Sequence, residues 1–275
     1  METTRAKAPA GIAAVRRIPK WKILSATNRV QEMRLFRHNR KLSESGFFNG
    51  FCDCHCHVLP GVDDGFGKKE DSFAALDYFA SIGVADMVLT PHVMAELSNT
   101  RGSLEKRFEE FLSSYSGDVG LRLGAEYMLD SGFPAHLKEG LLQIGQGMVL
   151  VETSCFYPLN NVAEMLYDVA TEGYVPVIAH PERYRYMELC DYESMKDKDC
   201  MLQLNLFSLT GAYGRLALKK SRDLLERGMY DLVGTDVHRL DSFVRWAGML
   251  KVDDAGMSAL EKLKNADAEL FRDPK

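Results

Sequence analysis

The chain has 275 residues, 46% of them hydrophobic and 27% charged, a composition typical of a globular protein with one large domain or two small ones. The net charge of -5 gives no overall sign of nucleic-acid binding, and no apolar run approaches the ~20 residues that span a bilayer. We therefore expect neither an integral membrane protein nor a nucleic-acid-binding protein.

The first 50 residues carry an excess of positive charge, with eleven Lys or Arg residues against three Glu residues. The apolar run from Ala10 to Val15 is too short for a secretory signal, so we predict a cytoplasmic protein. Blocks of like charge are usually solvated, and residues 1–50 are interpreted as a flexible or peripheral extension. A basic segment of this kind could also touch an anionic lipid surface. The domain itself is expected over residues 51–275.

From residue 51 onward, short apolar runs alternate with helical patterns. The runs rich in Val, Leu and Ile cover residues 51–58, 85–90, 119–125, 148–153, 174–179, 201–207 and 231–235. The helical patterns between them end at Gly83, Gly173 and Gly228, one begins at Ser103, and a last one surrounds Leu260. Strands that alternate with helices predict a parallel α/β sheet.

The predicted strands end in residues with ligand or hydrogen-bond chemistry. These residues are His55, His57, His92, Glu126, Glu152, His180, Asn205, Asp236 and His238. Their side chains meet only if the C-terminal ends of the strands meet, as in a (β/α) barrel. An open sheet would spread the strand ends over ~30 Å. We therefore predict a closed or nearly closed, seven-stranded TIM-like barrel, a distorted (β/α)7 fold.

The segment FCDCHCHVLPGVDDG, residues 51–65, combines imidazoles with carboxylates. In a regular strand His55 and His57 share one face, and the three cysteines of the segment lie on the other face, packed under helices. Asp63 and Asp64 follow in a tight turn, and either carboxylate could face a metal. Imidazole and carboxylate without thiolate suit manganese, iron or zinc. The plainer alternative is a strand with two hydrogen-bonded histidines and a solvated Asp-Asp turn.

The motifs HCH, DDG, TPH, GAEY, VET, AHPER and TDVH resemble, in order and spacing, those of the PHP (polymerase and histidinol phosphatase) superfamily. More narrowly, HCHVLPGVDDG, AHPERY and TDVH are similar to the metal-dependent protein-tyrosine phosphatases of bacterial capsule and exopolysaccharide clusters. The resemblance runs from about residue 51 to about residue 241. Residues 1–32 precede it and are interpreted as an extension or an upstream start-site artefact.

The resemblance implies a centre of three divalent metal ions, with manganese favoured and iron or zinc as alternatives. The implied ligands are His55, His57, Glu126 and Asp236 for the first ion, Glu126, Glu152 and His180 for the second, and Asp64, His92 and His238 for the third. Arg183 matches the position that grips the phosphate, and the catalytic set is Arg183, His55 and His57. The alternative for Arg183 is a surface ion pair with Glu182. His38 and His136 are interpreted as bystanders.

The implied reaction is hydrolysis of phosphotyrosine by metal-bound hydroxide. Four carboxylates facing three divalent cations leave a formal charge of +2, which a phosphate monoester dianion neutralises. None of the cysteines is followed by an Arg after five residues, and the sequence has neither a Gly-x-Ser-x-Gly elbow nor a Walker A loop. Cysteine-dependent and serine-dependent chemistry are therefore not expected.

The expected substrate is a phosphotyrosine protein, and the resemblance implies an autophosphorylated, membrane-bound bacterial tyrosine kinase that controls polysaccharide synthesis. Within the superfamily, the alternatives are histidinol-phosphate phosphatase, another phosphoesterase and an exonuclease. A metal-binding regulatory module without turnover is an alternative of another class. The sequence indicates neither the oligomeric state nor a general acid.

Overall fold

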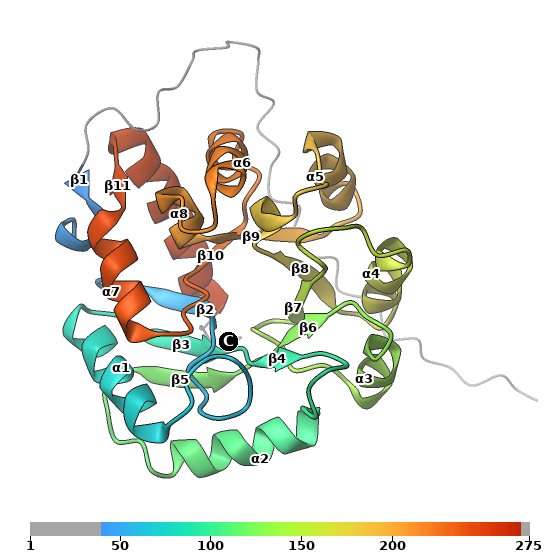
Figure 1. Cartoon of the computed structure of the whole chain (residues 1–275), viewed down its shortest axis with the longest axis horizontal. Helices are drawn as coiled ribbons and strands as arrows, with labels where there is room; N and C mark the ends of the chain where they lie inside the picture. Colours follow the sequence, from blue (N-terminus) through green and yellow to red (C-terminus); the bar gives the residue numbers. More distant parts are fainter. Residues whose placement is uncertain (1–39, 271–275) are drawn as a thin grey trace, which may run out of the picture. The chain divides into compact units, whose positions relative to one another are not determined.

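The computed structural model describes residues 40–270, in which parallel strands are surrounded by helices (Figure 1). The strands are β1 Arg40–Lys41, β2 Cys52–Cys56, β3 Asp86–Leu89, β4 His92–Val93, β5 Gly120–Leu123, β6 Glu126–Met128, β7 Met148–Glu152, β8 Val175–Ala179, β9 Met201–Asn205, β10 Leu232–Gly234 and β11 Lys251–Val252. The helices are α1 Lys69–Ser81, α2 Arg101–Leu112, α3 Phe133–Glu139, α4 Val162–Thr171, α5 Leu189–Lys196, α6 Arg215–Glu226, α7 Leu240–Met249 and α8 Asp254–Leu270. Three 3-10 helices are η1 Leu42–Glu44, η2 Pro181–Arg183 and η3 Leu206–Thr210.

The strands form a curled parallel wall. Six pair in the order β10-β9-β8-β7-β6-β4, three pair in the order β2-β3-β5, and β1 pairs with β11 in an antiparallel ribbon. The chain runs almost directly from β3 into β4 and from β5 into β6, so the two parallel sheets continue into each other. At the other end of the wall, Asp236 N donates to His55 O at 2.8 Å and His57 N donates to Val237 O at 2.9 Å. The predicted parallel α/β sheet is confirmed.

The two faces of this wall are both apolar, as expected for parallel strands covered by helices. Val149, Val151 and Ile178 belong to the large cluster that packs against the helices. The alternate residues on the same strands, Leu150 and Val177, belong to a smaller inner cluster. Ala266 and Ala268 pack against that inner cluster, so α8 covers one end of it.

A bulge in β2 changes the predicted arrangement of the cysteines. Asp53 pairs with Met87 and Cys56 pairs with Leu89, so three steps along β2 match two steps along β3. The extra residue switches which face the side chains take. As a result Cys54, like Cys52, lies in the inner cluster and only Cys56 packs in the large one. The prediction that the three cysteines share one face is wrong, because it assumed a regular strand, but all three are buried as predicted, and α8 covers the inner cluster of Cys52 and Cys54.

Carboxylates complete the junction between β2 and β10. Asp53 accepts hydrogen bonds from Thr235 N at 3.0 Å and His55 N at 3.2 Å, and Asp267 of α8 accepts from Val233 N at 3.2 Å. Burial raises the pKa of Asp53 to about 6 although the Thr235 hydrogen bonds lower it, and burial raises the pKa of Asp267 well above its usual value. Acidic side chains therefore satisfy backbone donors that a sheet ladder would otherwise satisfy.

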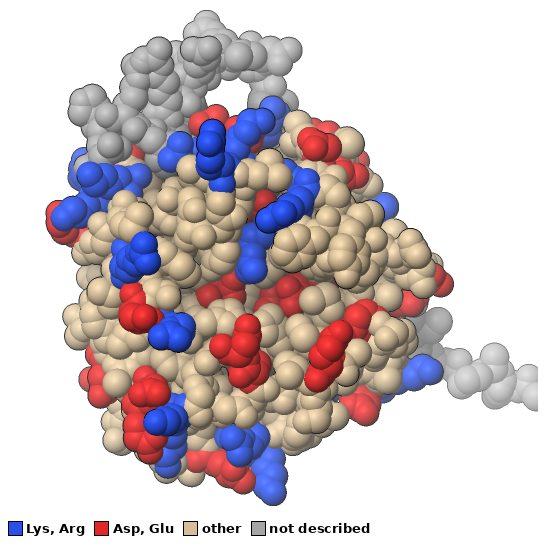
Figure 2. Space-filling view, in the orientation of Figure 1, with Lys and Arg blue, Asp and Glu red and all other residues tan. Residues whose placement is uncertain are grey.

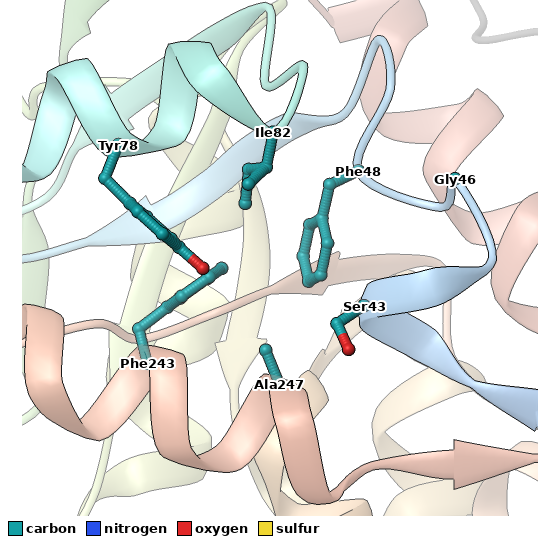
Figure 3. Close-up of a pocket in the computed structure, with 7 residues that line it drawn as sticks. All are labelled: Ser43, Gly46, Phe48, Tyr78, Ile82, Phe243 and Ala247. Carbon is teal, nitrogen blue, oxygen red and sulfur yellow. The ribbon is translucent and has the colours of Figure 1, made fainter.

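Residues 40–50 pack into the domain instead of extending from it. Leu42 and Phe47 are fully buried, and the Phe48 ring lies 5.3 Å from the ring of Phe243 on α7. A cavity of about 80 Å³ lies where this segment meets α1 and α7, with Tyr78 on its α1 side (Figure 3). Because these apolar side chains are removed from water, this part of the interpretation of residues 1–50 as an extension is wrong. Residues 1–39 lie outside the described part of the chain.

The helix ends agree with the glycine pattern. Gly83, Gly173 and Gly228 have φ values of 93°, 89° and 64°, the left-handed conformation that glycine adopts most easily after a helix. The start of α2 differs from the prediction, because Thr100 is the N-cap and Ser103 is its partner in a reciprocal capping box. Within residues 40–270, no helix combines the length and the apolar character needed to cross a membrane.

Candidate metal centre

All the predicted metal ligands meet at the C-terminal ends of the strands. They come from β2, the β2–α1 loop, β4, β6, β7 and the segments that follow β8 and β10. Figure 2 shows Asp and Glu side chains at the centre of one face of the molecule, with Lys and Arg side chains directly above them. His136, on α3, lies near Tyr127 and takes no part in the cluster, and His38 lies outside the described residues.

The most buried group consists of His55, His57, Glu126 and Asp236, all at most 3% exposed. His55 Nε2 lies 3.1 Å from Glu126 Oε2 and 3.4 Å from Asp236 Oδ1. His57 Nε2 lies 3.3 Å from each of the same two oxygens. Atoms bound to one ion at ~2.1 Å in tetrahedral or octahedral geometry lie roughly 3.0–3.4 Å apart. The spacing of these four atoms fits one shared cation.

The two histidines of this group are oriented by residues behind them. His55 Nδ1 lies 3.0 Å from Gln203 Oε1, and His57 Nδ1 lies 2.8 Å from Asp63 Oδ2. Each oxygen can accept the Nδ1 hydrogen, which leaves the Nε2 lone pair free to bind a metal. Asp63 also accepts from Gly65 N at 3.0 Å and His92 N at 3.1 Å, so its carboxylate is held in place.

A second group forms around Glu126 and Glu152. His92 Nδ1 lies 3.1 Å from Glu152 Oε1 and 3.2 Å from Glu126 Oε2. His180 Nε2 lies 2.9 Å from Glu126 Oε1 and 3.8 Å from Glu152 Oε2. The implied set for this ion contained His180 but not His92, so the structure adds His92 to the group.

A third group lies nearer the surface and contains His57, Asp64, His92 and His238. Asp64 Oδ1 lies 3.2 Å from His238 Nε2 and 3.5 Å from His92 Nε2, and its side chain is 74% exposed. Asp63 is turned away from this group towards the Nδ1 side of His57. Of the two neighbouring carboxylates, Asp64 is therefore the one that faces the ring nitrogens of the third group.

Two residues of the cluster have an unusual backbone. His180 has φ 33° and Asp236 has φ 53°, in the left-handed region that non-glycine residues rarely adopt. Strain of this kind persists only where the surroundings hold it, and it is common at functional sites. Close backbone packing is visible at Gly234, where a Cβ atom would lie 2.6 Å from the Cβ of His55. A side chain at position 234 would displace a candidate ligand.

Arg183 reaches into the cluster from the end of η2. Its Nη1 donates to Asp236 Oδ2 at 2.8 Å, and its guanidinium lies 4.6 Å from the centre of the Tyr213 ring. Glu182 does not pair with it, because Glu182 is 1% exposed and accepts hydrogen bonds from Asn205 N and Tyr230 OH. The alternative of a surface ion pair between Arg183 and Glu182 is wrong.

The electrostatics of the cluster favour added positive charge. Burial lowers the pKa of His55, but Glu126 and Asp236 raise it to about 9. Burial raises the pKa of Glu126, but His55 and His92 hold it well below its usual value. The pKa of Asp236 is likewise held well below its usual value, against burial, by His55, His57 and Arg183. The carboxylates therefore stay ionised and draw cations, which divalent metal ions would supply.

The buried Nδ1 nitrogen of His92 also indicates that the cluster binds metal ions. His92 Nδ1 makes no hydrogen bond although it faces the oxygens of Glu126 and Glu152. A buried polar atom without a partner is costly, and a cation shared with the two carboxylates would satisfy it. Together with a donor set of imidazoles and carboxylates, this nitrogen shows that the residues present fit divalent metal ions.

The sequence analysis missed two residues behind the ligands, Gln203, which contacts His55, and Tyr213, which lies against the Arg183 guanidinium. Asn205 was expected at a strand end, and its Nδ2 donates to Asp236 Oδ2 at 2.8 Å. Gln203 and Asn205 are two residues apart on β9 and thus point the same way, a polar pair on a buried strand that the pattern could have revealed. Nothing in the sequence around Tyr213 distinguishes it from other loop tyrosines.

The fold and the motifs have known counterparts. Tyrosine-protein phosphatase YwqE of Bacillus subtilis is 28% identical over 198 residues, 68% of this chain and 77% of that protein. Tyrosine-protein phosphatase CpsB of Streptococcus pneumoniae is 30% identical over 205 residues, 69% of this chain and 84% of that protein. A crystal structure from work on these two, described as metal-dependent tyrosine phosphatases, matches the fold with a TM-score of 0.62 and 23% identity. That match covers 80% of this chain and 90% of the other.

A family model described as "Capsular polysaccharide synthesis, CpsB/CapC" matches residues 51–254. The matched segment contains the whole cluster from His55 to His238, together with Arg183 and all the parallel strands. The chain belongs to the CpsB/CapC family.

Proposed function

We propose that this chain is a metal-dependent protein-tyrosine phosphatase that hydrolyses phosphotyrosine. The observation that carries the proposal is the convergence of five histidines and four carboxylates on one face, with Arg183 reaching into the cluster. The two relatives described above are named as tyrosine-protein phosphatases. Phosphotyrosine is therefore the substrate that family membership and site chemistry favour together.

The proposal includes three divalent cations, with manganese favoured. His55, His57, Glu126 and Asp236 would hold the first, Glu126, Glu152 and His180 the second, and Asp64 and His238 the third. His92 would complete either the second group through Nδ1 or the third through Nε2, because a neutral imidazole has one lone pair to donate. When bound, these cations would lower the pKa of a water molecule, so that hydroxide is the nucleophile, and neutralise phosphoryl oxygens. The seven-stranded (β/α)7 barrel also belongs to the proposal, with β3 and β4 counted as one bent strand and β5 and β6 as another.

Arg183 is proposed to bind the phosphate. Its guanidinium already lies at the cluster, held by Asp236 and by the Tyr213 ring. A planar guanidinium can donate two parallel hydrogen bonds to phosphate oxygens, which an ammonium group cannot.

The leaving group argues for an aryl ester. Tyrosine has a pKa near 10, so its departure requires less protonation than that of an alkyl alcohol. A centre that supplies cations and Arg183 therefore suits such a substrate better than histidinol phosphate. An autophosphorylated, membrane-bound tyrosine kinase as the natural substrate and a cytoplasmic location belong to the same proposal, and they rest on the family.

The test is phosphate release by the purified full chain from a phosphotyrosine peptide and from histidinol phosphate, each with manganese and with a chelator. We expect preferential hydrolysis of the peptide that the chelator abolishes and manganese restores. Preference for histidinol phosphate would replace the substrate but keep the metal chemistry. Metal binding measured in the same sample without turnover of either substrate would favour a binding module instead.

A further inference from the structure

The loop that follows β7, whose last residue Glu152 belongs to the metal centre, presents two aromatic side chains to solvent. Phe156 is 65% exposed and Tyr157 is 63% exposed, and they follow Glu152 of the centre by only a few residues. Large apolar side chains exposed next to each other commonly mark a binding surface. In Figure 2 a broad area without charged side chains lies to one side of the central carboxylates.

Arg185 lies against Phe156, the first residue of this pair. Its guanidinium is 4.8 Å from the centre of the Phe156 ring, and the residue is exposed. Among residues 40–270 it makes no ion pair and no side-chain hydrogen bond, whereas the neighbouring Arg183 is paired with Asp236. The guanidinium of Arg185 therefore packs against an aromatic ring, and it has no acidic partner among residues 40–270.

Hydrogen bonds to backbone atoms hold the two loops in this arrangement. Arg185 N donates to Cys155 O at 3.0 Å, and the hydroxyl of Tyr184 accepts from Thr153 N at 3.2 Å. On the other side, Lys220 Nζ donates to Tyr184 O at 2.7 Å and to Met187 O at 2.5 Å. The aromatic pair and Arg185 are thus presented on a fixed support, which lowers the entropy lost when a ligand binds.

The loop that carries Phe156 and the segment that carries Arg185 are also close enough to the centre for its charges to act on them. Burial raises the pKa of the Cys155 thiol to about 11, with Arg183 lowering it and Glu152 raising it further. Positions 183 and 185 are separated by one residue in extended conformation, so their Cα atoms are roughly 6–7 Å apart. A polypeptide whose phosphotyrosine reaches Arg183 would bring its flanking residues over Phe156 and Arg185.

We propose that Phe156, Tyr157 and Arg185 form a docking surface for the polypeptide that carries the phosphotyrosine, with Arg185 pairing with an acidic side chain one to three residues away. This proposal rests on the proposed function. The unpaired guanidinium selects a carboxylate by charge, and the aromatic side chains contact the apolar parts of the same segment.

The test compares two phosphotyrosine peptides that differ only in having Glu or Gln at the flanking positions, with phenyl phosphate as a substrate without flanks. The enzymes are the full chain, Arg185→Gln and the matched control Arg227→Gln, which removes an exposed charge where α6 ends, before the start of β10. We expect the unmodified chain to favour the Glu peptide in kcat/KM. Arg185→Gln should lose about two- to fivefold on the Glu peptide and little on the others, as for an exposed ion pair.

A second variant, Phe156→Ala, removes the aromatic support and should raise KM for both peptides while phenyl phosphate hydrolysis stays unchanged. Equal kcat/KM for the Glu and Gln peptides in the unmodified chain, or an unchanged preference in Arg185→Gln, would overturn the docking surface and leave the phosphatase proposal standing. Metal-dependent turnover of none of the three substrates would instead overturn the proposed function, and the docking surface with it.

Discussion

His55 Nδ1 and Gln203 Oε1 lie 3.0 Å apart, and this contact decides which nitrogen of His55 faces the carboxylates. The amide oxygen of Gln203 can only accept a hydrogen bond, so the neutral imidazole carries its proton on Nδ1 and keeps the Nε2 lone pair. Gln203 lies on β9 and His55 on β2, so the orientation of a candidate metal ligand depends on strands far apart in sequence.

The first prediction concerns Gln203→Leu, which keeps the approximate volume and removes the hydrogen-bond acceptor. Loss of such a partner behind a ligating histidine typically weakens metal binding about 10- to 100-fold. We expect this loss for Gln203→Leu when manganese binding is measured by calorimetry. Gln146→Leu is the matched control, because the Gln146 side chain is exposed and donates to Glu269 O, away from the candidate ligands, and it should bind manganese as the unmodified chain does. Unchanged affinity in Gln203→Leu would show that Gln203 does not orient His55.

The second prediction concerns Arg183→Lys. A lysine keeps the positive charge but cannot form two parallel hydrogen bonds to a phosphate, nor stack its face on Tyr213. A hydrogen bond to a charged group is worth about 1.5–3 kcal/mol, so kcat/KM for a phosphotyrosine peptide should fall roughly 10- to 100-fold. Manganese affinity should remain close to that of the unmodified chain, since Arg183 is not a ligand. A large loss of manganese would mean that Arg183 acts by holding Asp236 instead.

The third prediction is that manganese stabilises the fold itself. In the absence of cations, Glu126 and Asp236 are ionised, buried and close together, and protonated histidines only partly balance them. A ligand that binds only the folded chain stabilises it by about 2.7 kcal/mol at a concentration 100 times its Kd. Thermal unfolding should therefore shift several degrees upward with manganese and return with chelator. Glu126→Gln, which removes the carboxylate shared by two groups, should lose most of this shift.

Much of the architecture could be predicted from sequence because buried parallel strands are almost continuously apolar. Each of the seven predicted runs contains a strand. The polar residues at the ends of these runs predicted that the C-terminal ends of the strands lie close together. The local exceptions escaped prediction. The bulge that turns Cys54 inward depends on pairing with β3, and the short helices α3 and α5 have too few apolar residues to show a period.

The candidate site could likewise be predicted only in part from the sequence. The ligand types could be predicted from the strand ends, because the carboxyl ends of the strands in such a wall meet on one face. The grouping of these ligands around individual ions could not be predicted. His92 faces Glu152 with one ring nitrogen and Asp64 with the other, and this orientation depends on the backbone path between β3 and β4. Residues that act behind the ligands, such as Tyr213, require the three-dimensional structure.

The last prediction concerns Asp267, the buried carboxylate of α8 that accepts from Val233 N. Burial raises its pKa well above the usual value, with the nearby Asp53 raising it further. An acid whose folded-state pKa is raised contributes stability below its unfolded pKa near 4, and this contribution is lost as pH rises through the folded pKa. Asp267→Asn keeps an acceptor but cannot ionise, so its stability relative to the unmodified chain should increase from pH 5 to pH 8 in urea unfolding. Asp254→Asn, on the same helix but with a side chain 83% exposed, should show no such trend, and a parallel pH profile for Asp267→Asn would contradict the prediction.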